Sequence, residues 1–178
     1  MIRHARVGAS GTVALIEIDR HDKRNALDVD HLDQLHAAVV AADREGARAV
    51  VVAGRGTSFC AGADTSDAPD APSGGAGVYG EGFRVALYRA LGAITALPVP
   101  VVAAVHGAAI GAGTQLAIAC DLRVAGPRAL FAVPTARNGL AVDPWTVRRL
   151  AVLAGGGATR AMLLGADTLD AVTAYGRG

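Results

Sequence analysis

Apolar residues form three short runs along the chain, and polar or glycine-rich stretches separate them. The runs extend from Thr12 to Ile18, from Ala49 to Ala53 and from Pro100 to Val105. Short apolar runs bounded by turn-forming residues are typical of strands that are buried on both faces of a sheet. The pattern therefore predicts three buried strands.

Two longer segments have apolar residues at the three- and four-residue spacing of an amphipathic helix. Asp28 can cap the first segment and Gly46 can end it, whereas Pro98 stops the second. Strand, helix and strand in succession favour an α/β fold with right-handed crossovers. The core-facing positions are Leu32, Leu35, Val39 and Ala42 in the first segment, and Phe83, Leu87, Ala90, Leu91 and Ile94 in the second.

Three other segments carry weaker patterns. Thr65 to Gly80 is rich in Ser, Asp, Pro, Ala and Gly and has no period, which predicts a long irregular loop. Ala151 to Leu164 predicts two short helical stretches around Gly155-Gly156-Gly157. Leu169 to Gly176 predicts the start of a further helix.

Length and composition indicate one domain over residues 1–178. Of the 178 residues, 52% are hydrophobic and only 4% aromatic, so Val, Ala and Leu must form most of the core. The formal net charge of +1 gives no general attraction to nucleic acid or to an anionic membrane. No apolar run reaches the ~18 residues of a membrane span, and no signal peptide is recognisable, so a cytoplasmic location is the default expectation. Cys60 and Cys120 are expected to be reduced core residues.

Two turns made of small residues each follow a predicted strand. Phe59 to Asp64 follows the second strand, and His106 to Gln115 follows the third and opens a helix. Small side chains leave the backbone accessible, and the first N–H groups of a helix have no intrahelical partner. Two such turns side by side could direct backbone donors at one carbonyl oxygen, which is the arrangement of an oxyanion hole.

At these turns the sequence resembles the crotonase family, also called the enoyl-CoA hydratase/isomerase superfamily. The resemblance implies a spiral of ββα units that binds acyl-CoA thioesters and holds the thioester oxygen on two backbone N–H groups. By position, these groups belong to Ala63 and Ala112. The matching segments are Lys23 to Leu27, Phe59 to Asp64, His106 to Asp121 and Phe131 to Leu140.

Family members usually continue for a further set of helices that complete the acyl pocket and pack as trimers or dimers of trimers. The C-terminal helical part is truncated in this sequence, so the predicted crotonase-like domain is incomplete relative to the family. Either the sequence is a fragment, or the missing part is dispensable. A homotrimer or a dimer of trimers is expected if that part is present.

The resemblance also implies where coenzyme A binds. Lys23 and Arg24 would lie near its phosphates, and Ala26 and Asp64 are predicted to contact it. The alternative is that Lys23 and Arg24 are solvated loop cations and that Asp64 holds its turn in shape. No metal and no cofactor are predicted, since coenzyme A is part of the ligand. The irregular loop from Thr65 to Gly80 would lie over the acyl pocket.

The two glutamates of the family's hydratases are missing. Gln115 and Thr135 occupy their positions, and neither side chain exchanges a proton near neutral pH. General acid–base catalysis typically contributes 10²–10⁴-fold to a rate. We therefore expect a protein that binds a thioester but hydrates an enoyl-CoA very slowly.

One acid remains at a position that takes part in double-bond isomerisation in some family members, namely Asp143. Because Pro144 follows it, the sequence favours a helix N-cap at Asp143. The cap and a catalytic role are compatible only if one carboxylate oxygen is left free. The sequence leaves two main readings open: an acyl-CoA binder without catalysis, and an isomerase or other thioester enzyme that uses Asp143. A protein-interaction domain without a ligand would leave both small-residue turns unexplained. His106 and Asp121 are interpreted as structural.

Overall fold

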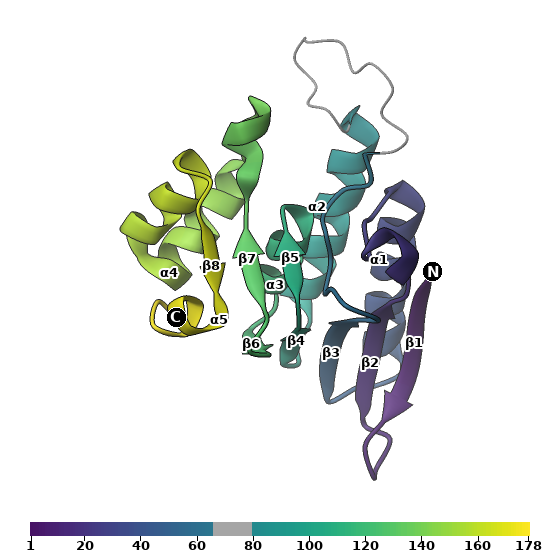
Figure 1. Ribbon diagram of the computed structural model, residues 1–178. Helices are drawn as coiled ribbons and strands as arrows, with labels where there is room; N and C mark the ends of the chain where they lie inside the picture. Colours follow the sequence, from purple (N-terminus) through teal and green to yellow (C-terminus); the bar gives the residue numbers. More distant parts are fainter. Residues whose placement is uncertain (66–79) are drawn as a thin grey trace.

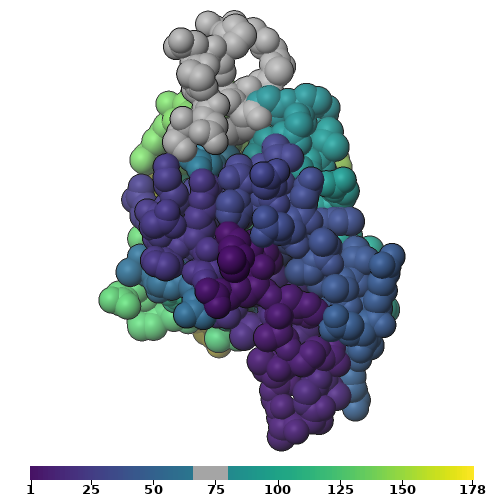
Figure 2. Space-filling model, turned by 90° about the vertical axis from the view of Figure 1, so that its right-hand side faces the viewer, coloured from purple at the N-terminus to yellow at the C-terminus, as the bar shows by residue number. Residues whose placement is uncertain are grey.

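The computed structural model describes residues 1–65 and 80–178 of the chain. The prediction of an irregular loop from Thr65 to Gly80 therefore falls almost entirely outside the described residues. Figure 1 shows β1 (Ile2–Val7) at one end of the molecule, and α4 (Pro144–Leu164), β8 (Thr168–Asp170) and α5 (Ala171–Tyr175) at the other. The turn between β1 and β2 projects from the lower end in both Figure 1 and Figure 2.

A five-stranded sheet has the order β1-β2-β3-β4-β6. β2, β3, β4 and β6 are parallel, and β1 pairs antiparallel with β2. The three strands predicted from apolar runs are β2, β3 and β4, which lie in the middle of the sheet. The edge strands β1 and β6 contain charged residues and therefore form no uninterrupted apolar run. The sequence did not predict them. The bounds are Ile2–Val7 for β1, Val13–Ile18 for β2, Ala49–Gly54 for β3, Val101–Val105 for β4 and Leu122–Ala125 for β6.

A smaller sheet of three short strands has the order β5-β7-β8. These are β5 (Ala108–Ile110), β7 (Leu130–Ala132) and β8 (Thr168–Asp170). Strands of three residues are too short to produce a recognisable period in the sequence. The helix start predicted at Leu169 was wrong by two residues, because Leu169 pairs with Phe131 in this sheet and α5 begins at Ala171.

The two predicted amphipathic helices are α1 (Val29–Arg44) and α2 (Gly80–Ala96), which pack next to each other. Asp28 caps α1, since its Oδ1 accepts a hydrogen bond from the N–H of His31 at 2.9 Å. Gly46 follows the C-terminus of α1 with a φ of 68°. Burial opposes the ionisation of Asp28, but hydrogen bonds from His31 outweigh it and leave the pKa of Asp28 below its ordinary value.

Two further helices and two short 3-10 turns complete the part that carries the site. They are α3 (Ala112–Ala119), α4 (Pro144–Leu164), η1 (His21–Lys23) and η2 (Pro134–Asn138). All eight residues of α3 are buried, so this helix runs through the interior. α4 is interrupted at Gly155, which has a φ of 79°, and this agrees with the two helical stretches predicted there.

Both cysteines lie in the hydrophobic core as free thiols, as predicted. Cys60 and Cys120 are each 0% exposed. Burial raises the pKa of both thiols to about 12, so both stay protonated at neutral pH. They are therefore packing residues.

Candidate functional site

The two small-residue turns lie side by side, joined by backbone hydrogen bonds. The N–H of Cys60 donates to the carbonyl oxygen of Ala108 at 2.9 Å, and the N–H of Ile110 donates to that of Cys60 at 2.9 Å. An isolated parallel bridge pairs Cys60 with Ala109. The segment after β3 therefore runs alongside β5, directly before α3.

Two glycines make this close approach possible. A Cβ atom on Gly113 would lie 2.2 Å from the carbonyl oxygen of Cys60. A Cβ atom on Gly62 would lie 2.8 Å from the carbonyl oxygen of Ile110, and Gly62 has a φ of 104°, which L-residues rarely adopt. The same added Cβ atom on Gly62 would lie 3.8 Å from the backbone nitrogen of Ala112. Only residues without a side chain allow α3 to begin against the turn that contains Ala63.

The N–H groups of Ala63 and Ala112 both lie at this junction. Ala112 is the first residue of α3, where no earlier helical turn supplies an acceptor. Around Ala63, the N–H of Leu27 donates to Gly62 and the N–H of Asp64 donates to Leu27. Among the backbone hydrogen bonds recorded over residues 1–65 and 80–178, none uses the N–H of Ala63 or of Ala112. Both N–H groups are therefore candidate donors to a ligand, and the oxyanion hole stays a prediction.

All nine residues that the sequence singled out for the site line one cavity of about 990 Å³. This volume is at the upper end of the range of ~300–1,000 Å³ for small-molecule sites. Apolar side chains from α2, from the residues next to η2 and from the start of α4 form much of the wall, including Phe83, Leu87, Val133, Leu140 and Trp145. The predicted residues on the wall are Lys23, Arg24, Ala26, Ala63, Asp64, Ala112, Gln115, Thr135 and Asp143.

The turn that carries Lys23 and Arg24 is held from inside the protein. Buried Asn25 donates through Nδ2 to the carbonyl oxygens of Arg55 at 2.8 Å and Ser58 at 2.7 Å. Arg24 and Asn25 have φ values of 51° and 60°, a conformation that asparagine tolerates better than most residues. Both cations are exposed, and their assignment to the phosphates of coenzyme A stays a prediction.

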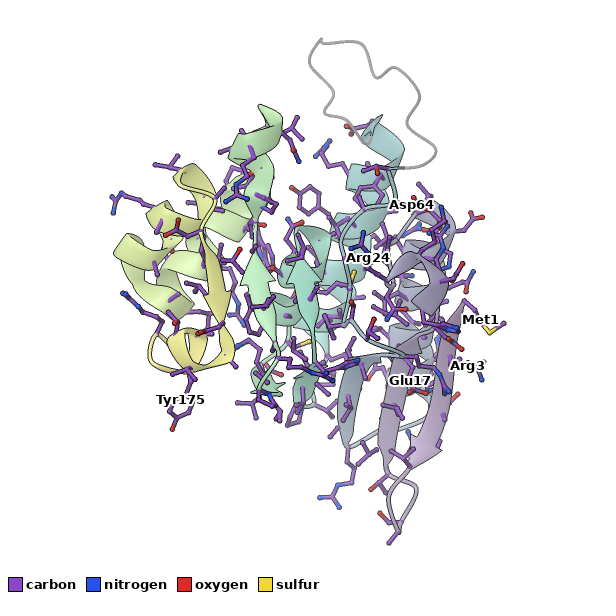
Figure 3. All side chains as sticks on the ribbon, viewed as in Figure 1. Met1, Arg3, Glu17, Arg24, Asp64 and Tyr175 are labelled. Atoms are coloured by element: carbon purple, nitrogen blue, oxygen red, sulfur yellow. The ribbon has the colours of Figure 1, made fainter. Side chains whose placement is uncertain are left out.

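Asp64 is ion-paired within the protein. Its Oδ2 lies 2.7 Å from Nη2 of Arg20, and its side chain is only 5% exposed. Figure 3 labels Asp64 and Arg24, which come from the two segments that meet at this wall of the cavity. The geometry agrees with the reading that Asp64 holds its turn in shape, and a contact with coenzyme A stays a prediction.

Gln115, Asp143 and Thr146 form a closed hydrogen-bonded cluster. Nε2 of Gln115 donates to Oδ2 of Asp143 at 2.9 Å and to Oγ1 of Thr146 at 2.7 Å. The hydroxyl of Thr146 donates to the same Oδ2 at 2.6 Å, and the N–H of Thr146 donates to Oδ1 at 2.9 Å. Asp143 is therefore the N-cap of α4, and both of its oxygens accept hydrogen bonds. Neither oxygen of Asp143 is thus without a hydrogen bond, which favours the capping role over the catalytic one.

Tyr88 of α2 lies beside this cluster. Burial, together with the charge of Asp143 and a hydrogen bond to it, raises the pKa of Tyr88 to about 12. The guanidinium of Arg84 lies 5.7 Å from the centroid of the Tyr88 ring. Tyr88 thus remains a neutral phenol at the wall of the cavity. Thr135 lies on η2, partly exposed, on the same wall.

Two further polar residues, His106 and Asp121, were interpreted from the sequence as structural. Nε2 of His106 lies 2.9 Å from the carbonyl oxygen of Gly56, away from the cavity wall. Oδ2 of Asp121 accepts from the N–H of Val101 at 2.8 Å. Both are structural contacts.

Sequence reasoning missed Arg20, Tyr88 and Thr146. Arg20 lies two residues after a predicted strand, and Thr146 lies three residues after a predicted N-cap, which is where a capped N–H is expected. Nothing in the sequence indicated that Tyr88 of α2 would reach Asp143.

The matching family model is described as Enoyl-CoA hydratase/isomerase and covers residues 8–178. The chain belongs to this family. A relative from Mycobacterium tuberculosis, named "Probable enoyl-CoA hydratase echA6", is 45% identical over 169 residues, which are 93% of this chain and 65% of the relative. This chain thus spans just under two thirds of the length of that relative.

Solved structures that resemble this chain have the same fold. Pseudomonas aeruginosa PA4980 superposes with a TM-score of 0.86 at 35% identity, over 99% of this chain and 74% of that one. An enoyl-CoA hydratase/carnithine racemase from Magnetospirillum magneticum superposes with a TM-score of 0.87 at 26% identity, over 99% of this chain and 65% of that one. The predicted α/β crotonase-like fold is therefore confirmed.

Within the two described stretches, no helix is both long and apolar enough to cross a bilayer. The cytoplasmic location and the trimeric assembly stay predictions.

Proposed function

We propose that the protein binds an acyl-CoA thioester, with the carbonyl oxygen on the N–H groups of Ala63 and Ala112, and that it has little or no hydratase activity. The ligand would place its phosphates near Lys23 and Arg24. Its acyl chain would follow the apolar wall of the same cavity. Such a protein would act in fatty acid metabolism as a binder or carrier.

The observation that carries this proposal is the cluster of Gln115, Asp143 and Thr146. A hydratase needs groups that activate a water and return its proton. Here both protons of the Gln115 amide are used on Asp143 and Thr146, and no ionisable group replaces them at Thr135. The proposal relies on the N–H groups of Ala63 and Ala112 as donors, and one oxyanion donor typically stabilises a developing charge by roughly 2.7–4 kcal/mol. The site is thus better suited to holding a thioester than to hydrating it.

The test combines calorimetric titration with a saturated acyl-CoA and a spectrophotometric assay of enoyl-CoA hydration on the same preparation. Ala112→Pro removes one donor at the first helical position, where proline is well tolerated. It is expected to weaken acyl-CoA binding about 2- to 12-fold, the equivalent of one net hydrogen bond. Ala112→Gly keeps the N–H and is the matched control. Ready hydration by the unmodified protein would contradict the proposal.

A second candidate is an isomerase or other thioester enzyme that uses Asp143. It is favoured by one observation, since Asp143 is an ionisable carboxyl that lines the cavity next to Tyr88. Its two occupied oxygens make proton abstraction less favourable, because each proton taken up would cost an accepted hydrogen bond. Asp143→Asn keeps an N-cap residue while removing the base. A turnover that this substitution abolishes would establish the enzyme and exclude the non-catalytic reading.

A further inference from the structure

Arg20 lies where the two predicted ligand-binding segments meet. Its Nη2 lies 2.7 Å from Oδ2 of Asp64, the residue after Ala63. Its Nη1 donates to the carbonyl oxygen of Ala26 at 3.0 Å and lies 3.4 Å from Oδ2 of Asp28. One guanidinium therefore contacts both sides of the backbone bridge between Leu27 and Ala63.

The main chain of Arg20 also holds the turn that carries the two cations. Its carbonyl oxygen accepts from the N–H of Lys23 at 3.0 Å and from that of Asn25 at 2.9 Å. Its own N–H donates to Oδ1 of Asn25 at 2.9 Å. The predicted phosphate-binding turn is thus folded around Arg20.

Burial makes the ion pair with Asp64 a strong restraint. The side chain of Arg20 is 19% exposed and that of Asp64 is 5% exposed, so water and salt screen this pair much less than a surface pair. A buried carboxylate without its cation is strongly unfavourable. Asp64 is therefore held in one position as long as Arg20 is present.

Ala63 is restrained from both neighbours. The N–H of Leu27 donates to the carbonyl oxygen of Gly62 at 2.8 Å, and the N–H of Asp64 donates to the carbonyl oxygen of Leu27 at 2.7 Å. Hydrogen bonds weaken steeply as their angle bends. A small rotation of the peptide between Gly62 and Ala63 would therefore remove the N–H of Ala63 as a useful donor.

We propose that Arg20 is a positioning residue for the thioester. It directs the N–H of Ala63 by fixing Asp64, and through Ala26 it keeps the turn with Lys23 in register with that donor. The inference rests on the proposed function, because it requires a thioester oxygen at Ala63. Loss of the Arg20 side chain should weaken recognition of the carbonyl more than binding of the nucleotide.

The test measures, by calorimetry, the affinity of the full chain for an acyl-CoA and for the S-alkyl-CoA of the same length, in which a methylene replaces the carbonyl. The ratio of the two dissociation constants isolates the carbonyl contacts. Two net hydrogen bonds correspond to a preference for the thioester of about 5- to 150-fold in the unmodified protein. Arg20→Met is expected to lower this preference at least about threefold. Its affinity for the S-alkyl compound should change less.

Asp64→Asn breaks the same pair from the other side and should lower the preference in the same direction. The double variant should lower the preference no further than Arg20→Met does, since Arg20→Met already removes the contact between Arg20 and Asp64. Arg3→Met is the matched control, because it removes an ion pair whose partner is Asp19, and it should leave the preference unchanged.

Circular dichroism and melting curves establish that each variant is folded. If Arg20→Met does not fold, the single variants Asp64→Asn and Arg20→Lys are measured in its place. A folded Arg20→Met or Asp64→Asn protein with an unchanged preference overturns the inference alone. An unmodified protein that binds both ligands equally, or neither, overturns the proposed function and the inference with it.

Discussion

Replacing Gln115 by glutamate would restore an acid at the position where the family's hydratases have one, but it would also place that acid against Asp143. Nε2 of Gln115 lies 2.9 Å from Oδ2 of Asp143. Two like charges that relax to about 4 Å repel each other by about 4 kcal/mol at an effective dielectric constant of about 20. This corresponds to a rise of about 3 units in the pKa of the introduced carboxyl, from about 4.3 to about 7. The two carboxyls would titrate as a coupled pair.

The raised pKa has a definite effect on stability. A group whose pKa is higher in the folded state contributes its stability below the unfolded pKa and loses it as the pH rises through the folded pKa. Relative to that of the unmodified protein, the free energy of unfolding of Gln115→Glu should therefore fall by about 1 kcal/mol from low pH to pH 5, and by about 3 kcal/mol more by pH 8. Hydration should remain very slow at pH 8, because Thr135 supplies no second acid.

Urea unfolding at pH 5 and at pH 8, for the unmodified protein and for Gln115→Glu, measures this difference directly. Thr135→Glu introduces a carboxyl on the same cavity wall, at a position with no recorded hydrogen bond to Asp143, and is the matched control. If Gln115→Glu and the control change in stability equally between the two pH values, the two side chains do not meet as described, and the reasoning fails.

Three other results are expected. Gly113→Ala, whose new Cβ would lie 2.2 Å from the carbonyl oxygen of Cys60, should destabilise the protein by about 1–3 kcal/mol or more and should weaken acyl-CoA binding, as melting curves and calorimetry would show. Lys23→Ala combined with Arg24→Ala should weaken binding of coenzyme A itself, more at low salt than at high salt, and a salt-independent loss would speak against a phosphate contact. Because the pKa of Asp28 is depressed in the folded state, its stabilising effect should be present above about pH 4 and should disappear as the pH falls further. The free energy of unfolding of Asp28→Asn should therefore depend less on pH between about pH 5 and about pH 2. The same pH dependence in the variant and the unmodified protein would contradict this.

Local patterns were sufficient for the elements that depend on neighbours in the chain. The central strands β2, β3 and β4 followed from uninterrupted apolar runs. The capping of α1 by Asp28 needs only residues one helical turn apart, and so does the capping of α4 by Asp143. The short strands β5, β7 and β8 could not be predicted in this way, because three residues carry no period and their pairing depends on distant segments.

The sequence by itself determined which residue types face the cavity, including the absence of an acid at Gln115 and Thr135. Only the tertiary structure decided which of them meet. Gln115 reaches Asp143 across 28 positions of the chain, and Arg20 reaches Asp64 between two separate turns. Such contacts arise from the order of strands in the sheet and from the approach of glycine backbones, neither of which leaves a local signal. Residue types are a property of single positions, whereas hydrogen-bond partners are a property of the packed chain.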